Sequence, residues 1–322
     1  MQTSTVAVCI CTFRRPAGLR YLLTCLAGQT FTDVPAPKIS VIVADNEGNP
    51  ESRHICSEFR RKQFKSLTYV HEPRRGISYA RNACLDHVPV ETDFVAMIDD
   101  DEAPDIAWLN HLLFAQSRSG ADVVVGPTYP DFQAGTPAWI SDCGFFLKPD
   151  NPSRFRNLQA DPPAATCNVL VNATIFSTPG LRFDPQLALS GGEDKLMFQD
   201  IKLRGYSFVW AANAKVTEFI SGERATFSYM WREQYRRGSV KYYVKRRMKV
   251  SNRLKLIRLV PKFFARAMAN ILAGCYGVIA QLLRNREDRS ALALSALIIA
   301  DGIGSISGLL HLTNHHYLRQ RL

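Results

Sequence analysis

The sequence lacks the cysteine patterns that would mark a structural metal or a disulfide framework. Its eight cysteines are scattered over 322 residues, with no Cys-x-x-Cys pair and no Cys/His cluster at zinc spacing. The N-terminal stretch lacks a basic region, and its first apolar run, Val6–Cys11, is too short for the core of a signal peptide. We therefore expect free thiols in a reducing compartment and no secretion.

Internal repeats, low-complexity tracts and a glycine-rich phosphate loop are absent as well. The segment Thr12–Arg20 holds a single glycine, Gly18, which argues against a nucleotidyltransferase with an N-terminal phosphate loop. The composition, with 46% hydrophobic and 21% charged residues, is that of a folded protein. A chain of this length can form two or three domains, or one large α/β domain with an appendage.

The first third of the chain alternates between strand and helix patterns. Short apolar runs predict strands, and segments with helical periodicity lie between them. The predicted strands are Val6–Cys11, Ile39–Ala44, Leu67–His71 and Asp93–Ile98, and the predicted helices are Ala17–Leu26, Glu51–Lys62 and Ile77–His87. This alternation predicts right-handed βαβ units and a parallel sheet, in which ligands bind beyond the carboxyl ends of the strands.

Three consecutive carboxylates, Asp99, Asp100 and Asp101, follow the last of these strands. Adjacent carboxylates repel one another, so their position at the end of a core strand favours a bound cation. Hard oxygen ligands suit Mg²⁺ or Mn²⁺, which bind few carboxylates and keep sites free for phosphate oxygens. The alternative is that Asp100 or Asp101 caps a helix that begins near Asp105.

Five motifs along about residues 5–220 carry a resemblance to a known family. Each of them ends a predicted strand or opens a predicted helix. They are Thr12-Phe-Arg-Arg15, Asp45-Asn46, Arg74-Arg-Gly-Ile-Ser-Tyr-Ala-Arg-Asn82, Asp99–Asp101 and Gly191-Gly-Glu-Asp194. In this order and spacing they resemble the family 2 glycosyltransferases of the GT-A fold. The segments Cys11–Arg15, Ile98–Pro104 and Val216–Glu218 look most like the exopolysaccharide enzymes of the succinoglycan type.

The resemblance implies an α/β fold of the GT-A kind, with a Rossmann-like, mostly parallel central sheet and a C-terminal helical, membrane-associating extension. We expect the GT-A domain at residues 1–224. Its nucleotide-binding half would cover about residues 1–105 and its acceptor half about 106–224. Residues 225–322 would form a basic and apolar helical tail.

A UDP-sugar donor needs its base recognised and its pyrophosphate neutralised. Asp45, at the end of the second strand, can accept the imino N–H of uracil, and the resemblance implies the same. Its alternative is to cap the following helix. Thr12 and Arg14 would contact the uridine or its phosphates. Arg81 would face the nucleotide, unless it is an ordinary surface arginine.

The resemblance also implies a divalent cation, Mg²⁺ or Mn²⁺, held by the acidic triplet. Asp99 would lie near the ribose, and Asp101 would hold the cation that bridges both phosphates. Asp100 would support these two more than it would bind a ligand. Many relatives carry a histidine as a further metal ligand, and the nearest equivalent here is Glu218, which we expect in that place.

Asp194 is the candidate general base, which would take the proton of the acceptor hydroxyl as that oxygen attacks the anomeric carbon. A single displacement of this kind inverts the configuration. Glu193 would orient the site or the acceptor. The alternative is that both residues stabilise a helix N-terminus. The Gln-x-x-Arg-Trp motif of processive synthases is absent, so we expect one sugar to be added per encounter.

The tail is strongly basic from Arg232 to Arg266, where only Glu233 opposes thirteen cations. These cations are Arg232, Arg236, Arg237, Lys241, Lys245, Arg246, Arg247, Lys249, Arg253, Lys255, Arg258, Lys262 and Arg266. Such a run suits either nucleic acid or an anionic membrane surface. No nucleic-acid motif accompanies it, whereas two apolar stretches follow, Ala267–Leu283 and Ala291–Leu312, the second broken by Asp301. We expect no nucleic acid as partner, and a helical hairpin that lies in or dips into the membrane. Packing of both helices on the catalytic domain is the alternative.

Together these features predict a metal-dependent, inverting enzyme of bacterial exopolysaccharide biosynthesis. It would transfer a sugar, glucose on the resemblance, from a UDP-sugar to a polyprenyl-diphosphate-linked oligosaccharide. Its place would be the cytoplasmic face of the inner membrane. The alternative is a non-catalytic nucleotide-sugar-binding or membrane scaffold protein on a GT-A fold. Such a protein would be expected to lack Asp101 or Asp194, and both are present.

Overall fold

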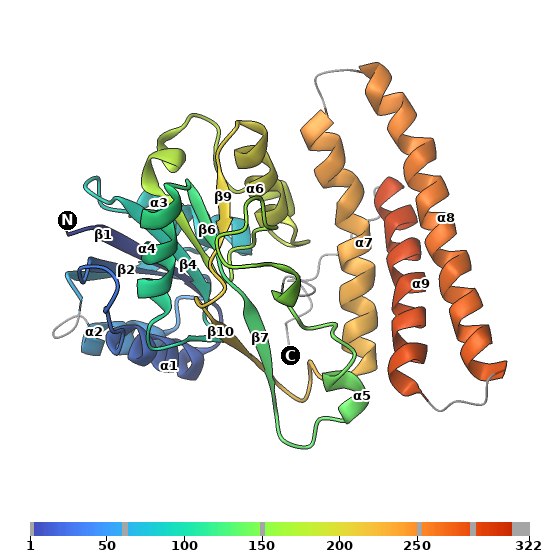
Figure 1. Ribbon diagram of the computed structural model, residues 1–322, viewed down its shortest axis with the longest axis horizontal. Coiled ribbons are helices and arrows are strands. Elements are labelled where there is room, and N and C mark those ends of the chain that lie inside the picture. The colour runs from blue at the N-terminus through green and yellow to red at the C-terminus, as the bar shows by residue number, and fades with distance from the viewer. Residues whose placement is uncertain (1–2, 60–63, 149–151, 250–252, 284–287, 311–322) are drawn as a thin grey trace. The chain divides into compact units, whose positions relative to one another are not determined.

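A computed structural model describes residues 3–59, 64–148, 152–249, 253–283 and 288–310 (Figure 1). The chain divides into two compact units. The sheet unit comprises Met1–Asp131, Leu147–Ala188 and Glu193–Phe219, and the helical unit comprises Phe132–Phe146, Leu189–Gly192 and Ile220–Leu322. Two internal segments of the expected GT-A domain, together with its last residues 220–224, thus belong to the helical unit, which the sequence did not predict.

A seven-stranded, mostly parallel sheet forms the centre of the sheet unit, as predicted. Its strand order is β3-β2-β1-β4-β8-β6-β9. Strands β1 to β4 run parallel, whereas β8 is antiparallel to both of its neighbours. The bounds are β1 Thr5–Thr12, β2 Lys38–Asp45, β3 Ser66–His71, β4 Phe94–Asp99, β6 Val123–Val125, β8 Val169–Asn172 and β9 Phe208–Trp210.

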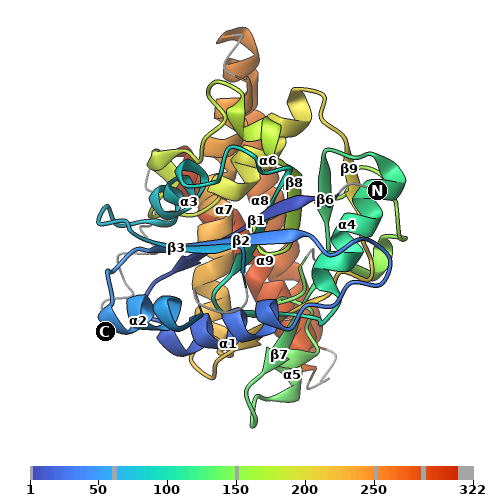
Figure 2. The ribbon, with the colours of Figure 1, turned by 90° about the vertical axis from the view of Figure 1, so that its left-hand side faces the viewer.

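Helices cover both faces of this sheet, which explains why its strands are apolar without alternation. On one face α1 (Pro16–Ala27), α2 (Pro50–Phe59) and α4 (Trp108–Ser119) pack against Val6, Val8 and Ile10 of β1. On the other face α3 (Ile77–Asp86) and α6 (Glu193–Leu203) pack (Figure 2). The leucine stripe of α1 at helical spacing is fully buried, as its periodicity predicted. The result is a three-layer sandwich.

A second, three-stranded sheet was not predicted. It consists of β5 (Glu102–Pro104), β10 (Val216–Ile220) and β7 (Thr128–Phe132), in the order β5-β10-β7. Strand β5 begins directly after Asp101. Its pairing with β10 therefore holds the chain in place where the acidic triplet ends. Short 3-10 turns complete the described elements of the sheet unit, at Pro152–Arg154, Ala173–Ser177 and Pro185–Leu187.

One predicted strand is shorter in the structure, and one predicted helix extends beyond the described residues. The composition of Cys167–Phe176 predicts a strand over that whole segment, but β8 ends at Asn172, because the Asn172 side chain accepts a hydrogen bond from the Thr174 N–H and begins a 3-10 turn there. The predicted helix Glu51–Lys62 is observed as α2, and its positions 60–62 lie outside the described residues.

The helical unit contains the short α5 (Ala138–Ser141) and three long helices, α7 (Phe227–Lys249), α8 (Arg253–Leu283) and α9 (Arg289–Leu309). Helix α9 lies between α7 and α8 (Figure 1). By length and composition, Leu259–Leu283 and Arg289–Leu309 are each apolar enough to cross a membrane, with mean hydropathies of 1.4 and 1.8. The last two residues of the predicted apolar stretch Ala291–Leu312 lie outside the described residues.

Candidate active site

The polar ends of three strands meet at one edge of the sheet. Thr12 of β1 lies opposite Asp45 of β2, and Cys11 lies opposite Asp99 of β4. The expected convergence of these residues is therefore observed, because parallel strands in register end together.

Asp100 fastens the turn after β1 to the end of β4. Its carboxylate accepts hydrogen bonds from the Thr12 hydroxyl at 2.8 Å and from Arg15 Nη1 at 2.9 Å. Burial raises the pKa of Asp100 to about 6, although the Arg15 guanidinium opposes this shift. Gly18 permits the approach of α1, since a Cβ there would overlap the Asp100 carbonyl oxygen. Asp100 thus acts as a support in this structure.

The same contact occupies the Thr12 hydroxyl, which is 2% exposed. Its predicted contact with the nucleotide would require that hydroxyl to exchange partners, so this role stays a prediction.

Asp45 is fully buried, and donors surround its carboxylate. Oδ1 accepts from the backbone N–H groups of Glu47 and Gly48, at 2.9 and 3.1 Å. Oδ2 accepts from the Asn49 N–H and the Tyr69 hydroxyl, both at 2.7 Å. This geometry favours the capping alternative, in which Asp45 shapes the loop before α2. A bond to uracil would have to replace one of these four, so recognition of the base stays a prediction.

Cations gather on the Phe13 ring beside these strand ends. The guanidinium of Arg14 lies 5.2 Å from the ring centroid and that of Arg75 lies 4.9 Å from it. Arg14 takes a left-handed backbone conformation, with φ of 59°, and its Nε donates to Glu47 at 2.6 Å. Half of its side chain is exposed. Two guanidiniums on one ring form a cationic surface that suits phosphate oxygens.

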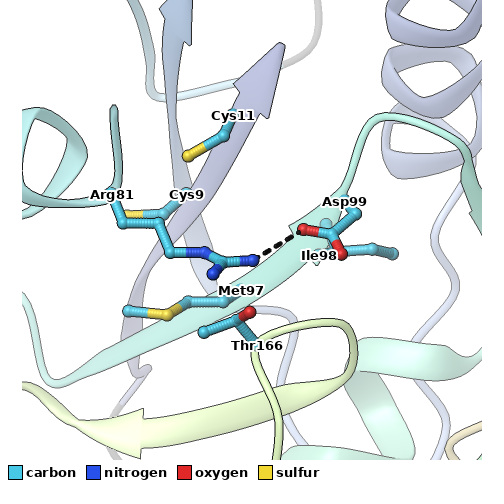
Figure 3. Close-up of a pocket in the computed structure, with 7 residues that line it drawn as sticks. All are labelled: Cys9, Cys11, Arg81, Met97, Ile98, Asp99 and Thr166. Atoms are coloured by element: carbon cyan, nitrogen blue, oxygen red, sulfur yellow. Dashed lines mark hydrogen bonds and ion pairs between the residues drawn. The ribbon is translucent and has the colours of Figure 1, made fainter. Parts of the chain in front are cut away.

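Arg81 is buried and joins three elements of the sheet unit. Its guanidinium, on α3, donates to Glu193 of α6. It also donates to Asp99 of β4, at 3.3 Å (Figure 3). Burial lowers the pKa of Arg81, but the two carboxylates outweigh it and raise that pKa above its usual range. The surface alternative for Arg81 is therefore wrong, since its exposed fraction is 8%. A small pocket lies beside it, lined by Cys9, Cys11, Arg81, Met97, Ile98, Asp99 and Thr166.

The two acids that open α6 differ in their surroundings. Glu193 is 3% exposed and is held by Arg81, so it orients the first turn of the helix. Asp194 is only partly buried, and its Oδ1 accepts from the Lys195 N–H at 2.6 Å. Asp194 is thus the more accessible of the two carboxylates, as a base that meets an acceptor must be.

Asp99 and Asp101 keep part of their carboxylates at the surface. Their side chains are 31% and 17% exposed, and Asp101 pairs with Arg15 at 3.0 Å. Within the described residues no group of three His, Cys, Asp or Glu side chains could hold a metal ion by itself. Two partly open carboxylates nevertheless fit Mg²⁺ or Mn²⁺, which commonly bind one or two carboxylates together with substrate phosphates.

Glu218 has a partner that the sequence did not reveal. Its carboxylate is 3% exposed and pairs with the Lys148 ammonium at 2.8 Å. On the neighbouring strand it faces Glu102, whose Oε2 accepts from the Asp99 N–H at 2.9 Å. Burial, together with the Asp99 carboxylate, raises the pKa of Glu102 well above its usual range. The cluster of Lys148, Glu102 and Glu218 therefore lies behind the acidic triplet, and a metal role for Glu218 stays a prediction.

Comparison with known proteins agrees with this geometry. The family described as Glycosyl transferase family 2 matches residues 7–176. Succinoglycan biosynthesis protein ExoM of Rhizobium meliloti (strain 1021) is 31% identical over 239 residues, which cover 74% of this chain and 74% of that protein.

Solved structures of GT-A glycosyltransferases share the fold. S. aureus TarS 1-349 in complex with UDP has a TM-score of 0.52 at 14% identity, and the match covers 94% of this chain and 90% of that one. The mannosyltransferase PcManGT from Pyrobaculum calidifontis, in complex with GDP-Man and Mn²⁺, has a TM-score of 0.60 at 15% identity. That match covers 95% of this chain and 88% of the other.

The Lys148 pair gives a first prediction. Lys148→Met leaves the buried Glu218 charge uncompensated and should lower the free energy of unfolding by about 1–3 kcal/mol. The double variant Lys148→Met with Glu218→Gln should recover most of this loss. Urea unfolding measures both. Lys65→Met, which breaks the exposed Lys65–Glu91 pair, is the control and should change stability by less than about 0.5 kcal/mol. A double variant no more stable than Lys148→Met would contradict the pairing.

Proposed function

Because this chain belongs to glycosyl transferase family 2, we propose that it transfers a sugar from a nucleotide-sugar to an acceptor hydroxyl with inversion. The observation that carries the proposal is the Arg81 bridge. It ties the strand that ends in the acidic triplet to the helix that begins with Glu193 and Asp194. Arg81 thus connects the acidic triplet, proposed to bind the leaving diphosphate, with Glu193 and Asp194, proposed to act on the acceptor hydroxyl.

The donor diphosphate would lie against the acidic triplet and the nearby guanidiniums. Asp101 would hold a divalent cation, with Asp99 beside it near the ribose. When bound there, the cation would supply charge stabilisation for the departing nucleoside diphosphate. Arg14 and Arg75, on the Phe13 ring, can neutralise further phosphate charge.

On the acceptor side, Asp194 would remove the hydroxyl proton as that oxygen forms its bond to the anomeric carbon. The bond from that carbon to the diphosphate oxygen breaks in the same step, and the diphosphate carries the electron pair away. Attack from the face opposite the leaving group inverts the configuration. Glu193, held by Arg81, would keep the first turn of α6 in place.

The comparisons support a nucleotide-sugar donor, because two solved neighbours are complexes with UDP and with GDP-Man. We propose UDP-glucose as the first donor to test, on the family resemblance. The ExoM relative supports a role in succinoglycan-type exopolysaccharide biosynthesis. The acceptor would then be a polyprenyl-diphosphate-linked oligosaccharide at the cytoplasmic face of the inner membrane, and the basic, apolar tail supports this membrane location.

If Asp194 is the general base, its replacement should lower turnover without weakening UDP binding. Asp194→Asn should lower the turnover number by roughly 10²- to 10⁴-fold, because it removes the proton acceptor. It should leave the affinity for UDP close to that of the wild type. Steady-state kinetics and UDP titration measure the two quantities. Asp200→Asn, on the same helix, is the matched control and should keep wild-type turnover. Full turnover by Asp194→Asn would remove Asp194 from the base role.

The metal assignment can be tested by Mn²⁺ binding in the presence of UDP, followed by the electron paramagnetic resonance signal of free Mn²⁺. Asp101→Ala should weaken binding by roughly 10- to 100-fold, since it removes a ligand. Glu218→Gln, measured in parallel, tests the third-ligand prediction, because a similar loss would place Glu218 in the metal shell. Wild-type affinity in Asp101→Ala would refute the assignment of Asp101.

A further inference from the structure

Helix α9 is packed tightly against α7 within the helical unit. A Cβ at Gly304 would overlap the Tyr235 carbonyl oxygen, and one at Gly308 would overlap that of Ser239. The Tyr235 hydroxyl and Ser307 Oγ lie 2.7 Å apart, within hydrogen-bond distance. The glycines of α9 therefore let the two backbones approach closely over several turns.

Asp301, which interrupts the second apolar stretch, is buried among the three long helices and accepts hydrogen bonds from two of them. It is 5% exposed, and its Oδ1 accepts from Lys241 of α7 at 2.5 Å and from Gln234 at 3.1 Å. Its Oδ2 accepts from Asn270 of α8 at 3.0 Å. The charge is paired and hydrogen-bonded from both neighbouring helices, so it fixes the order of the three helices.

This packing is incompatible with a membrane-spanning α9. Helix α7 lies along α9 from Met230, beside Leu297, to Tyr242, beside Leu309. This part of α7 carries the cations Arg232, Arg236 and Arg237. If α9 crossed the bilayer in this arrangement, α7 would be drawn into the hydrocarbon with these charges, which is strongly unfavourable. The apolar composition of α9 is explained instead by its position between α7 and α8.

Helix α8 leaves an apolar stripe uncovered. Leu272, Tyr276, Ile279 and Leu283 recur at helical spacing, and their exposed fractions are 65%, 75%, 55% and 81%. The 17 residues from Ala267 to Leu283 contain no charge. At 1.5 Å per residue this segment is about 25 Å long, which is shorter than the roughly 30 Å hydrocarbon core of a bilayer. The longer apolar span Leu259–Leu283 could therefore cross only with Lys262 or Arg266 close to the hydrocarbon.

The charges around this stripe favour an anionic partner. Lys262 and Arg266, at the start of the uncharged segment, are both exposed. These two cations adjoin the stripe and can attract the anionic headgroups of a bilayer surface.

We propose that α8 is an interfacial membrane helix. Its stripe of Leu272, Tyr276, Ile279 and Leu283 enters one leaflet of an anionic bilayer, and neither α8 nor α9 crosses. The proposal rests on the membrane location given above and adds the surface and the topology by which the chain is held there.

The first test is flotation of the full chain with vesicles of equal parts phosphatidylcholine and phosphatidylglycerol. The triple variant Leu272→Ser, Ile279→Ser, Leu283→Ser should partition at least about tenfold more weakly than the wild type, because three inserted side chains become polar. The control variant Val90→Ser, Ile106→Ser, Leu203→Ser changes three exposed apolar residues of the sheet unit and should bind like the wild type. Equal binding by the two variants would overturn the proposal, as would absence of wild-type binding.

The second test reads topology with an impermeant maleimide, on chain synthesised outside sealed vesicles. Cysteines are introduced separately by Arg232→Cys on α7 and Arg289→Cys at the start of α9, in a Cys275→Ser background. Both positions are exposed and should react without detergent if α8 lies in the outer leaflet. Protection of Arg289→Cys until detergent is added would show that α8 crosses, and would overturn the proposal.

UDP binding and size-exclusion chromatography distinguish loss of membrane attachment from loss of the nucleotide site and from dimer formation. UDP binding by the triple variant reports on the nucleotide site alone, so a failure of the proposed transferase activity is distinguishable from a failure of membrane attachment. Size-exclusion chromatography of the wild type without lipid tests the other occupant of the stripe, a second copy of this chain. A wild-type dimer that the triple variant dissociates would overturn the lipid assignment.

Discussion

The buried guanidinium of Arg81 is the interaction on which the candidate site depends. It draws together Asp99 at the end of β4 and Glu193 at the start of α6, which are far apart in the sequence. Without this cation the two carboxylates would repel each other in a poorly solvated place, where unpaired charge is strongly destabilising. Because Asp194 follows Glu193 directly, the same contact sets where the proposed base lies relative to the acidic triplet. The residues proposed for binding and those proposed for chemistry are thus tied to one side chain.

Burial separates the supporting carboxylates of the sheet unit from those that can meet a ligand. Asp45, Asp100 and Glu218 are almost fully buried, and each is held by donors or a cation from neighbouring segments. Asp99 and Asp101 remain partly open at the strand end. Of the buried carboxylates, Asp100 pairs with Arg15 and Glu218 pairs with Lys148, whereas Asp99 and Asp101 lie nearer the surface.

The sequence predicts well whatever depends on local pattern. The alternation of strand and helix patterns predicted the parallel strands β1 to β4, and the Leu19–Leu26 stripe predicted the buried face of α1. Local pattern does not reveal partners that distant loops supply. Lys148 lies in a stretch without periodicity, so its pairing with Glu218 could not be anticipated. The four hydrogen bonds to Asp45 likewise depend on how its loop folds back. The GT-A fold is confirmed by the comparisons, whereas the residue roles stay proposals.

The most direct test of the central claim is calorimetric titration of UDP, with and without Mn²⁺, into the wild type and Arg81→Met. Thermal denaturation of both proteins checks that the variant stays folded. We expect the wild type to bind UDP only with Mn²⁺ and a folded Arg81→Met to lose this binding, because the carboxylates of Asp99 and Glu193 no longer share a cation. UDP binding by Arg81→Met with wild-type affinity and metal dependence would contradict that claim.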